Sequence, residues 1–153
     1  MDGLTIRAPR AGEAEALTEL ALTAKASWGY DAAFMAACRD ELTVTAERLA
    51  DWDYWVADLD GRLAGLIALS HADGVAELED FFVDPQAQGR GVGKALMAAF
   101  LDACRAKGLS LVRVAADPNA EPIYARLGYR TVGQIPSGSI PGRMLPRMEL
   151  RLI

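Results

Sequence analysis

The sequence predicts an α/β fold with a mixed sheet, in which an antiparallel meander is followed by a β-α-β crossover. Two features carry this prediction. The pairs Asp60-Gly61 and Asp73-Gly74 separate three strand-like runs, and Asp-Gly suits the tight turn of a hairpin. A long amphipathic stretch then extends from Arg90 to Lys107, and another strand-like run follows it. Antiparallel strands are therefore expected before a helix that joins two parallel strands.

The first fifty residues predict one short strand and three helical segments. Thr5-Ile6-Arg7 is expected as a strand, which Pro9 ends. Glu13 to Lys25 repeats alanine and leucine at helical spacing, so this stretch predicts an amphipathic helix. Asp31 is expected to cap a second short helix, and Thr45 is expected to cap another helical turn.

The rest of the chain predicts the meander, a long helix and four shorter segments. The meander strands are expected at 54–59, 62–70 and 75–83. Apolar residues lie on one face of the stretch 90–107, and Gly108 stands where a left-handed C-terminal cap is expected. The segments that follow are a strand at 109–115, a short helix up to 127, a strand at 129–132 and a period-two strand at 147–152.

Length and composition limit the classes of function. The chain has 153 residues, of which 52% are hydrophobic and 24% charged, and this fits one globular domain over residues 1–153. The formal net charge of −5 repels polyanions, so no nucleic-acid partner is expected. Cys38 and Cys104 lack metal-binding spacing, and no apolar run approaches the roughly 18 residues that span a bilayer. We expect a cytoplasmic protein without membrane contact.

A glycine-rich loop, Gln88 to Lys94, lies between a predicted strand and the long helix. The unpaired N–H groups and the dipole at the start of a helix favour an anion, and glycine lets a phosphate approach the backbone. The P-loop pattern fails because only three residues separate Gly89 from Gly93 and Ala95 has no hydroxyl. The dinucleotide fingerprint also fails in spacing, since Gly93 follows Gly91 by two positions.

The remaining pattern, Gln-x-x-Gly-x-Gly after a strand ending in Val-Asp-Pro, resembles the GNAT superfamily of acetyl-CoA-dependent N-acetyltransferases. The residues that carry the resemblance are Leu78 to Val83, Asp84-Pro85, Gln88, Gly91, Gly93 and Tyr124 to Tyr129. The last stretch is similar to the Tyr-x-x-x-Gly-aromatic signature of that family. The resemblance implies a GNAT-like acyl-CoA N-acyltransferase fold with a splayed central strand pair, and acetyl-CoA as co-substrate.

The resemblance also implies which residues bind the cofactor. The main-chain N–H groups that would cradle the pyrophosphate belong to Gln88, Gly89, Arg90, Gly91, Val92, Gly93 and Lys94. Arg90 and Lys94 would add positive charge, and the pantetheine arm would pair with backbone groups of Phe82 and Val83 inside the splay. Asn119 matches a cofactor-contacting asparagine of the family, or it caps the short helix that follows.

Glu77, Glu79 and Tyr124 are the candidate catalytic residues. In the predicted strand 75–83, side chains alternate between two faces. One face carries Glu77, Glu79, Phe81 and Val83, and the other carries Leu78, Asp80 and Phe82. The resemblance places a general base at Glu77, and either glutamate suits that role, unless both are solvated carboxylates. The resemblance places Tyr124 beside the sulfur, where it would protonate the thiolate, unless it is a core tyrosine. Amide formation from a thioester requires no metal.

The acceptor end is implied to lie between residues 28–31 and 135–146, and Arg143 offers a partner for a negative group. We therefore favour a primary amine on a small molecule or an amino-acid-like acceptor. Protein or peptide amines remain an alternative, and so does a non-catalytic acyl-CoA-binding sensor. Homodimer formation stays open.

Overall fold

A computed structural model describes residues 3–152 as a mixed α/β structure, which confirms the predicted fold class. The strands are β1 (Leu4–Arg7), β2 (Asp53–Leu59), β3 (Arg62–Ala72), β4 (Val75–Val83), β5 (Leu111–Ala115), β6 (Arg130–Pro136) and β7 (Met144–Arg151). The α-helices are α1 (Ala14–Ala26), α2 (Ala32–Leu42), α3 (Ala46–Asp51), α4 (Val92–Ala106) and α5 (Glu121–Arg126). Two short 3-10 turns are η1 (Pro85–Ala87) and η2 (Pro118–Ala120). Over residues 3–152, no helix has both the length and the apolar character needed to cross a bilayer.

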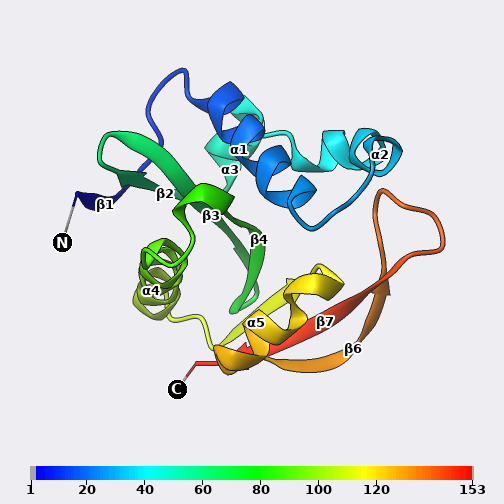
Figure 1. Cartoon of the computed structure of the whole chain (residues 1–153). Coiled ribbons are helices and arrows are strands. Elements are labelled where there is room, and N and C mark those ends of the chain that lie inside the picture. Colours follow the sequence, from blue (N-terminus) through cyan, green and yellow to red (C-terminus); the bar gives the residue numbers. More distant parts are fainter. Residues whose placement is uncertain (1–2, 153) are drawn as a thin grey trace.

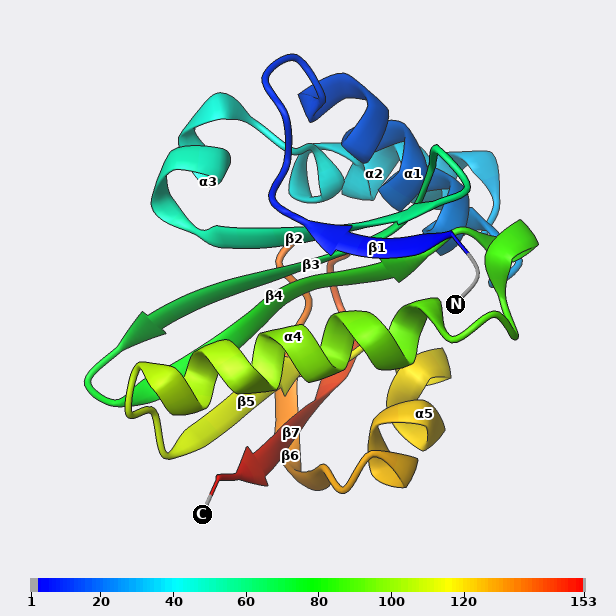
Figure 2. The same ribbon diagram turned by 90° about the vertical axis from the view of Figure 1, so that its left-hand side faces the viewer.

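The strands form one sheet in the order β1-β2-β3-β4-β5-β7-β6. Every neighbouring pair is antiparallel except β4 and β5, which are parallel and are joined through α4. The predicted meander and β-α-β crossover are therefore confirmed. Figure 1 shows α4 on one side of the meander and α1, α2 and α3 on the other, and Figure 2 shows α4 running along the strands.

Local signals in the sequence account for the element boundaries. Asp60 and Gly61 have φ angles of 54° and 85°, and Asp73 and Gly74 have φ angles of 54° and 78°. Positive φ at both central positions is the type I′ geometry whose twist matches a hairpin, so both predicted turns are confirmed. The helix caps also agree with the prediction, as the carboxylate of Asp31 accepts the Phe34 N–H and the hydroxyl of Thr45 accepts the Arg48 N–H.

Two apolar cores hold the sheet between its helices. On the α4 side, Leu96 and Phe100 pack with Ile67 and Val112 of the sheet, and all four are fully buried. On the α1 side, Leu17 packs with sheet residues such as Val56 and Leu66. Leu96 and Phe100 lie on the predicted apolar face of the long helix, so the helical period sets which side of α4 meets the sheet.

A β-bulge in β4 overturns part of the predicted alternation. Leu78 pairs with Leu69 and Asp80 pairs with Ala68, so Glu79 is an extra residue without a partner on β3. Ala76 and Leu78 lie on the α4 side before the bulge, and Phe81 and Val83 lie on that side after it. Glu77 and Glu79 share a face as predicted, but that face carries Asp80 and Phe82 rather than Phe81 and Val83.

The sheet opens at its centre, between β4 and β5. Their pairing runs from Val75 with Leu111 to Leu78 with Val114 and then ends, although β4 continues to Val83. The predicted splay is therefore confirmed, and the β5-facing edge of β4 is unpaired from Glu79 onward. The sheet consists of two parts that touch through four register pairs. One smaller difference concerns β6, which extends to Pro136 instead of ending at Val132.

Candidate active site

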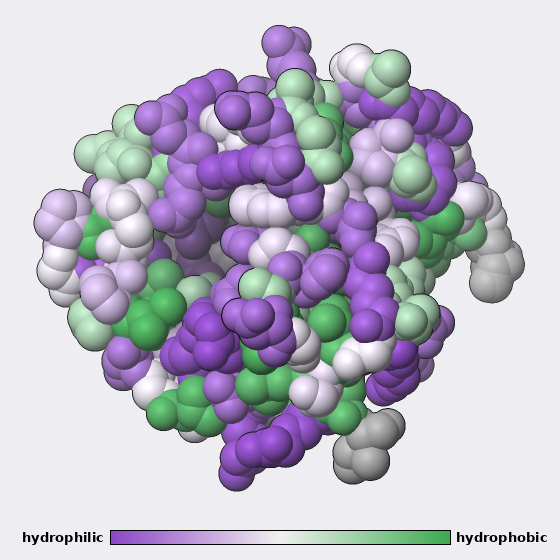
Figure 3. Space-filling model, turned by 180° about the vertical axis from the view of Figure 1, so that it is seen from behind, coloured by the Kyte–Doolittle hydropathy of each residue, from purple (hydrophilic) through white to green (hydrophobic). Residues whose placement is uncertain are grey.

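A cavity of about 1040 Å³ follows the opening between β4 and β5. One end is lined by the glycine loop and the start of α4, the middle by β4 and α5, and the other end by α1, α2, α3 and the loop after β6. Figure 3 shows a hollow bordered by hydrophilic side chains on the face seen from behind. The cavity has the size of a pocket for a cofactor-sized ligand.

The glycine loop presents free N–H groups to one end of this cavity. Gly89 and Gly91 both have φ of 81°, a left-handed conformation that favours glycine, and Gly91 is the N-cap of α4. No side chain caps this helix, and the first helical bond runs from the Ala95 N–H to the Gly91 carbonyl. The N–H groups of Val92, Gly93 and Lys94 therefore have no partner within the helix.

All of the predicted loop residues except Arg90 line the cavity. The guanidinium of Arg90 instead lies 3.9 Å from the carboxylate of Asp60, at the first hairpin turn. Lys94 is therefore the cation of the loop that lines the cavity. Anion binding by this loop stays a prediction, but its geometry is that of a helix N-terminus open to an anion.

The exposed edge of β4 is the second feature of the cavity. The Asp84 N–H donates to the Ala64 carbonyl at 2.8 Å, so Asp84 points its amide toward the β3 side. Alternate residues of a strand direct their N–H groups to opposite neighbours, and Phe81 and Val83 therefore point theirs into the gap left by β5. Phe82 and Val83, the predicted pantetheine residues, both line the cavity. The backbone N–H of Phe82 points toward β3, as that of Asp84 does, so Val83 and Phe81, rather than Phe82, offer backbone groups to the gap.

The two predicted glutamates line the cavity but differ in their partners. Both carboxylate oxygens of Glu77 accept hydrogen bonds from Arg147, at 2.7 and 3.1 Å. Glu79 accepts a hydrogen bond from the Ser70 hydroxyl at 2.7 Å, and burial raises the pKa of its carboxyl. Glu77 is thus held by a bidentate ion pair, whereas Glu79 keeps one oxygen available.

Asp80 is a site residue that the sequence interpretation missed. It is only 7% exposed and lines the cavity, and its one hydrogen bond within residues 3–152 comes from the Tyr54 hydroxyl at 3.4 Å. Burial raises its pKa to about 7, against the opposing effect of Arg48. Strict alternation placed Asp80 on the same strand face as Leu78 and Phe82. An acidic residue on an apolar face was the signal in the sequence that could have indicated a functional role.

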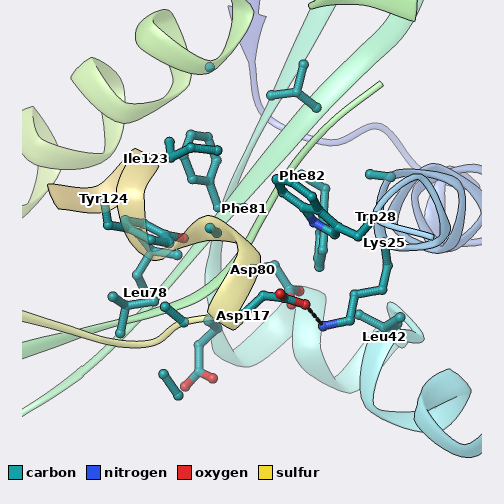
Figure 4. A pocket seen from close by; sticks show the side chains of 18 of the residues that line it. Lys25, Trp28, Leu42, Leu78, Asp80, Phe81, Phe82, Asp117, Ile123 and Tyr124 are labelled. Atoms are coloured by element: carbon teal, nitrogen blue, oxygen red, sulfur yellow. Dashed lines mark hydrogen bonds and ion pairs between the residues drawn. The ribbon is translucent and has the colours of Figure 1, made fainter. Parts of the chain in front are cut away.

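Tyr124 lies in the cavity wall opposite this carboxylate. Its side chain is 6% exposed and its ring contacts the rings of Phe81 and Tyr129, with centroids 6.1 and 5.3 Å away. Burial raises the pKa of its phenol, helped by Tyr129 and by Asp80. Figure 4 shows Tyr124 and Asp80 facing the same space. The phenol is both part of the core and part of the cavity wall, so the two interpretations of this residue are compatible.

A hydrogen-bond network closes the acceptor end. The Tyr30 hydroxyl donates to Asp117 and accepts hydrogen bonds from Asn119 and from Arg143. Lys25 forms an ion pair with Asp117 at 2.7 Å, drawn as the dashed line in Figure 4. These contacts connect the loop after α1 to the loop after β5 and to the loop after β6.

The network changes the setting of two predicted residues. Asp117, not Asn119, caps the turn η2 through its carboxylate, and Ala120 is the N-cap of α5, so the capping alternative for Asn119 is wrong. Asn119 lies outside the cavity lining, with its amide on Tyr30, and its cofactor role stays a prediction. Arg143 lines the cavity 3.6 Å from Asp117, so a carboxylate of the chain already offsets its charge.

The fold is that of an acyl-CoA N-acyltransferase. Residues 10–139 match the family model of the acetyltransferase (GNAT) domain, and the chain belongs to this family. The fold is similar to that of the PaiA N-acetyltransferase from Thermoplasma acidophilum, solved in complex with coenzyme A. The TM-score is 0.81 and the identity 19%, over 97% of this chain and 99% of that chain.

Two curated relatives are more similar in sequence but much longer. Mycothiol acetyltransferase of Clavibacter michiganensis is 41% identical over 76 residues, which cover 48% of this chain and 25% of the relative. N-acetylaspartate synthetase of Danio rerio is 31% identical over 101 residues, which cover 63% of this chain and 36% of the relative. The matched segments thus cover at most 36% of the length of either relative. Within residues 3–152, no group of three or more His, Cys, Asp or Glu side chains is arranged to hold a metal ion.

Proposed function

We propose that this protein transfers an acetyl group from acetyl-CoA to the primary amine of a small, amino-acid-like acceptor, by direct attack in a ternary complex. One observation carries the proposal. A single cavity joins a helix N-terminus with free N–H groups, an unpaired strand edge, a buried phenol and a buried carboxylate. These features offer donors for a pyrophosphate, pairing groups for an extended arm, and an acid and a base for acyl transfer.

The cofactor is expected to complete the open part of the sheet. Its pyrophosphate accepts hydrogen bonds from the N–H groups of the loop 88–94, with Lys94 nearby. Its pantetheine arm lies along β4, where the backbone groups of Phe81 and Val83 take the place of the lost β5 pairing. The thioester then reaches the part of the cavity lined by Asp80 and Tyr124.

The proposed chemistry removes two protons from the acceptor ammonium and delivers one proton to the sulfur. The carboxylate of Asp80 takes the proton of the acceptor ammonium, because its pKa of about 7 suits a base at neutral pH, and Glu79 is the second candidate. The neutral amine attacks the thioester carbonyl, and the Val83 N–H donates to the resulting oxyanion. The carbon–sulfur bond then breaks, and the Tyr124 hydroxyl protonates the departing thiolate. The second proton of the former ammonium leaves the amide nitrogen and restores the phenol of Tyr124, while Asp80 releases its proton to solvent.

In this proposal, Glu77 holds the side chain of Arg147 in position and does not transfer a proton. Arg147 occupies both of its oxygens, so Glu77 is a poor acceptor for a substrate proton. The raised pKa of Tyr124 keeps its phenol protonated at neutral pH, as a proton donor requires.

A small acceptor is favoured by the network that spans the acceptor end. Tyr30, Asp117 and Arg143 tie three loops together there, and this contact limits the access of a folded protein chain. Both curated relatives are also named for small molecules, mycothiol and N-acetylaspartate.

The test is a thiol-release assay with acetyl-CoA and panels of amino acids, polyamines and peptides, run on the wild type, Tyr124→Phe and Tyr129→Phe. Tyr129 is the matched control, because its buried hydroxyl donates to Met97 and not to the cavity. We expect release with amino acids, a decrease in kcat of about 100-fold for Tyr124→Phe, and little change for Tyr129→Phe. Turnover of peptides alone would exclude the small acceptor. Cofactor binding without release on any amine would favour a sensor.

A further inference from the structure

Arg48, on α3, brings an unpaired positive charge into the wall of the acceptor end. Its Nη1 donates to the carbonyls of Glu41 and Thr43, at 2.8 and 2.7 Å. Within residues 3–152, it has no carboxylate ion-pair partner, and its Nε and Nη2 make no hydrogen bond. This distinguishes it from Lys25 and Arg143, which both face the carboxylate of Asp117.

The guanidinium of Arg48 is held in place from several sides. The two carbonyls fix one nitrogen, and the ring of Trp52 lies under the guanidinium with its centroid 5.2 Å away. The backbone N–H of Arg48 is bound by the side chain of Thr45, which caps α3. A guanidinium fixed in this way has little freedom left to lose when it binds a ligand through its remaining donors.

A chain of contacts relates this charge to the proposed base. The Trp52 ring stacks on Tyr54 with centroids 6.3 Å apart, and the Tyr54 hydroxyl donates to Asp80 at 3.4 Å. Arg48 also lowers the pKa of both Asp80 and Glu79, so its charge acts at the site where the acceptor nitrogen is expected. The cavity thus offers a cation and two carboxylates close together.

We propose that Arg48 binds a carboxylate of the acceptor through its free Nε and Nη2 edge while the acceptor ammonium faces Asp80 and Glu79. The substrate class is then an amino acid, or another amine with a carboxylate a few atoms from the reacting nitrogen. Arg48 takes the place of Arg143 as the anion-binding residue, since Asp117 already offsets the charge of Arg143. This inference rests on the proposed function.

The test compares amino acids with their amides, which keep the amine and lack the carboxylate. Initial rates are measured for the wild type, Arg48→Met, Arg48→Lys and Arg39→Met. Arg39 is the matched control, because it is an exposed arginine on α2 whose one ion pair within residues 3–152 is with Glu19 at 3.7 Å. Thermal melts and calorimetry with coenzyme A show whether each variant is folded and binds the cofactor.

We expect the wild type to prefer the amino acid over its amide by about 100-fold in kcat/KM. Because Arg48 lowers the pKa of Asp80, the variants are compared on the pH plateau above the acidic limb, where Asp80 is ionised in all of them. There Arg48→Met should raise KM for the amino acid by about the same factor with kcat little changed, and should leave the kinetics of the amide unaffected. Arg48→Lys should lie between the two, because lysine keeps the charge and loses the bidentate geometry. Arg39→Met should match the wild type.

Two outcomes separate the inference from the function on which it rests. Equal rates with amino acid and amide, or an equal loss on both in Arg48→Met, overturn the role of Arg48 and leave acetyl transfer standing. Absence of thiol release with every amine overturns acetyl transfer itself, and this inference with it.

Discussion

At the scale of single residues, Asp80 is the side chain whose environment determines most of the expected behaviour. Burial raises its pKa to about 7, whereas an unfolded aspartate titrates near roughly 3.9. Between these pH values the folded protein keeps a proton that the unfolded chain releases. The free energy of unfolding therefore falls as pH rises from about 4 to about 7, and the ionised side chain destabilises the fold above that range.

Asp80→Asn should accordingly be more stable than the wild type at pH 8, by about 4 kcal/mol, because asparagine has no charge to bury. The difference should disappear below pH 4. Thermal unfolding over this pH range checks the prediction, with Asp73→Asn in the exposed second hairpin turn as the control. An equal gain at pH 4 and pH 8 would mean that burial of the charge is not the cause.

The same carboxylate should set the acidic limb of the pH–rate profile. We expect kcat/KM to rise with pH and level off above about 7, as Asp80 loses its proton. Asp80→Asn should lower the rate by about 100-fold and remove the limb, whereas Glu77→Gln and Glu79→Gln should retain it. Loss of the limb in Glu79→Gln alone would assign the base to Glu79 instead.

At the scale of elements, the start of α4 is the part on which the proposed cofactor binding depends most. Gly91→Glu places bulk and negative charge at a left-handed position beside the free N–H groups, so it should abolish binding of coenzyme A. Gly108→Glu is the matched control, because Gly108 has φ of +74° just beyond the other end of the same helix, and a Cβ there meets no atom within 4 Å.

Both variants should lose about 1 kcal/mol of stability from backbone strain, but only Gly91→Glu should lose the affinity measured by calorimetry. Undiminished binding by Gly91→Glu would remove the loop from the cofactor site. An equal loss of affinity in both variants would show that general destabilisation is responsible.

The sequence predicts an element correctly when residues close together in the chain determine that element. The Asp-Gly turns, the caps Asp31 and Thr45 and the apolar face of α4 arise within a few residues of sequence, and the sequence predicts them all. The bulge at Glu79 depends on how β4 pairs with β3, which no pattern within β4 reveals. That single inserted residue moved Asp80 into the site.

Side-chain contacts between distant segments were equally hidden. Arg147 reaches Glu77 across 70 positions, and Tyr30 reaches Asp117 across 87. The motifs therefore predicted a glycine loop that lines one end of the cavity, but not which acids are free or already paired. Arg48 was missed because its backbone carbonyl partners depend on the path of the chain between α2 and α3.

At the scale of the whole molecule, the two parts of the sheet should be stabilised together by the cofactor. A ligand that binds only the folded state adds about 2.7 kcal/mol at a concentration 100 times its Kd. For a chain of this length, the expected increase in Tm is about 5–10 °C. Scanning fluorimetry with coenzyme A measures it, and adenosine at the same concentration is the control. Absence of any shift with coenzyme A at saturation would contradict binding in the gap.

The overall charge and the local charges of the protein also act on different scales. The chain carries a formal net charge of −5, yet the cavity wall includes Lys94 at one end and Arg48 at the other. Local positive charge of this kind would favour the proposed binding of an anionic cofactor and of an acceptor carboxylate by a protein that is acidic as a whole.

The unpaired edge of β4 has a practical consequence. While the gap is empty, the amide protons of Phe81 and Val83 have no carbonyl partner on β5, so they should exchange quickly with deuterium from the solvent. A molecule seated along the strand would slow both exchanges. Two backbone positions thereby report occupancy directly, without a label, a chromophore or knowledge of the acceptor.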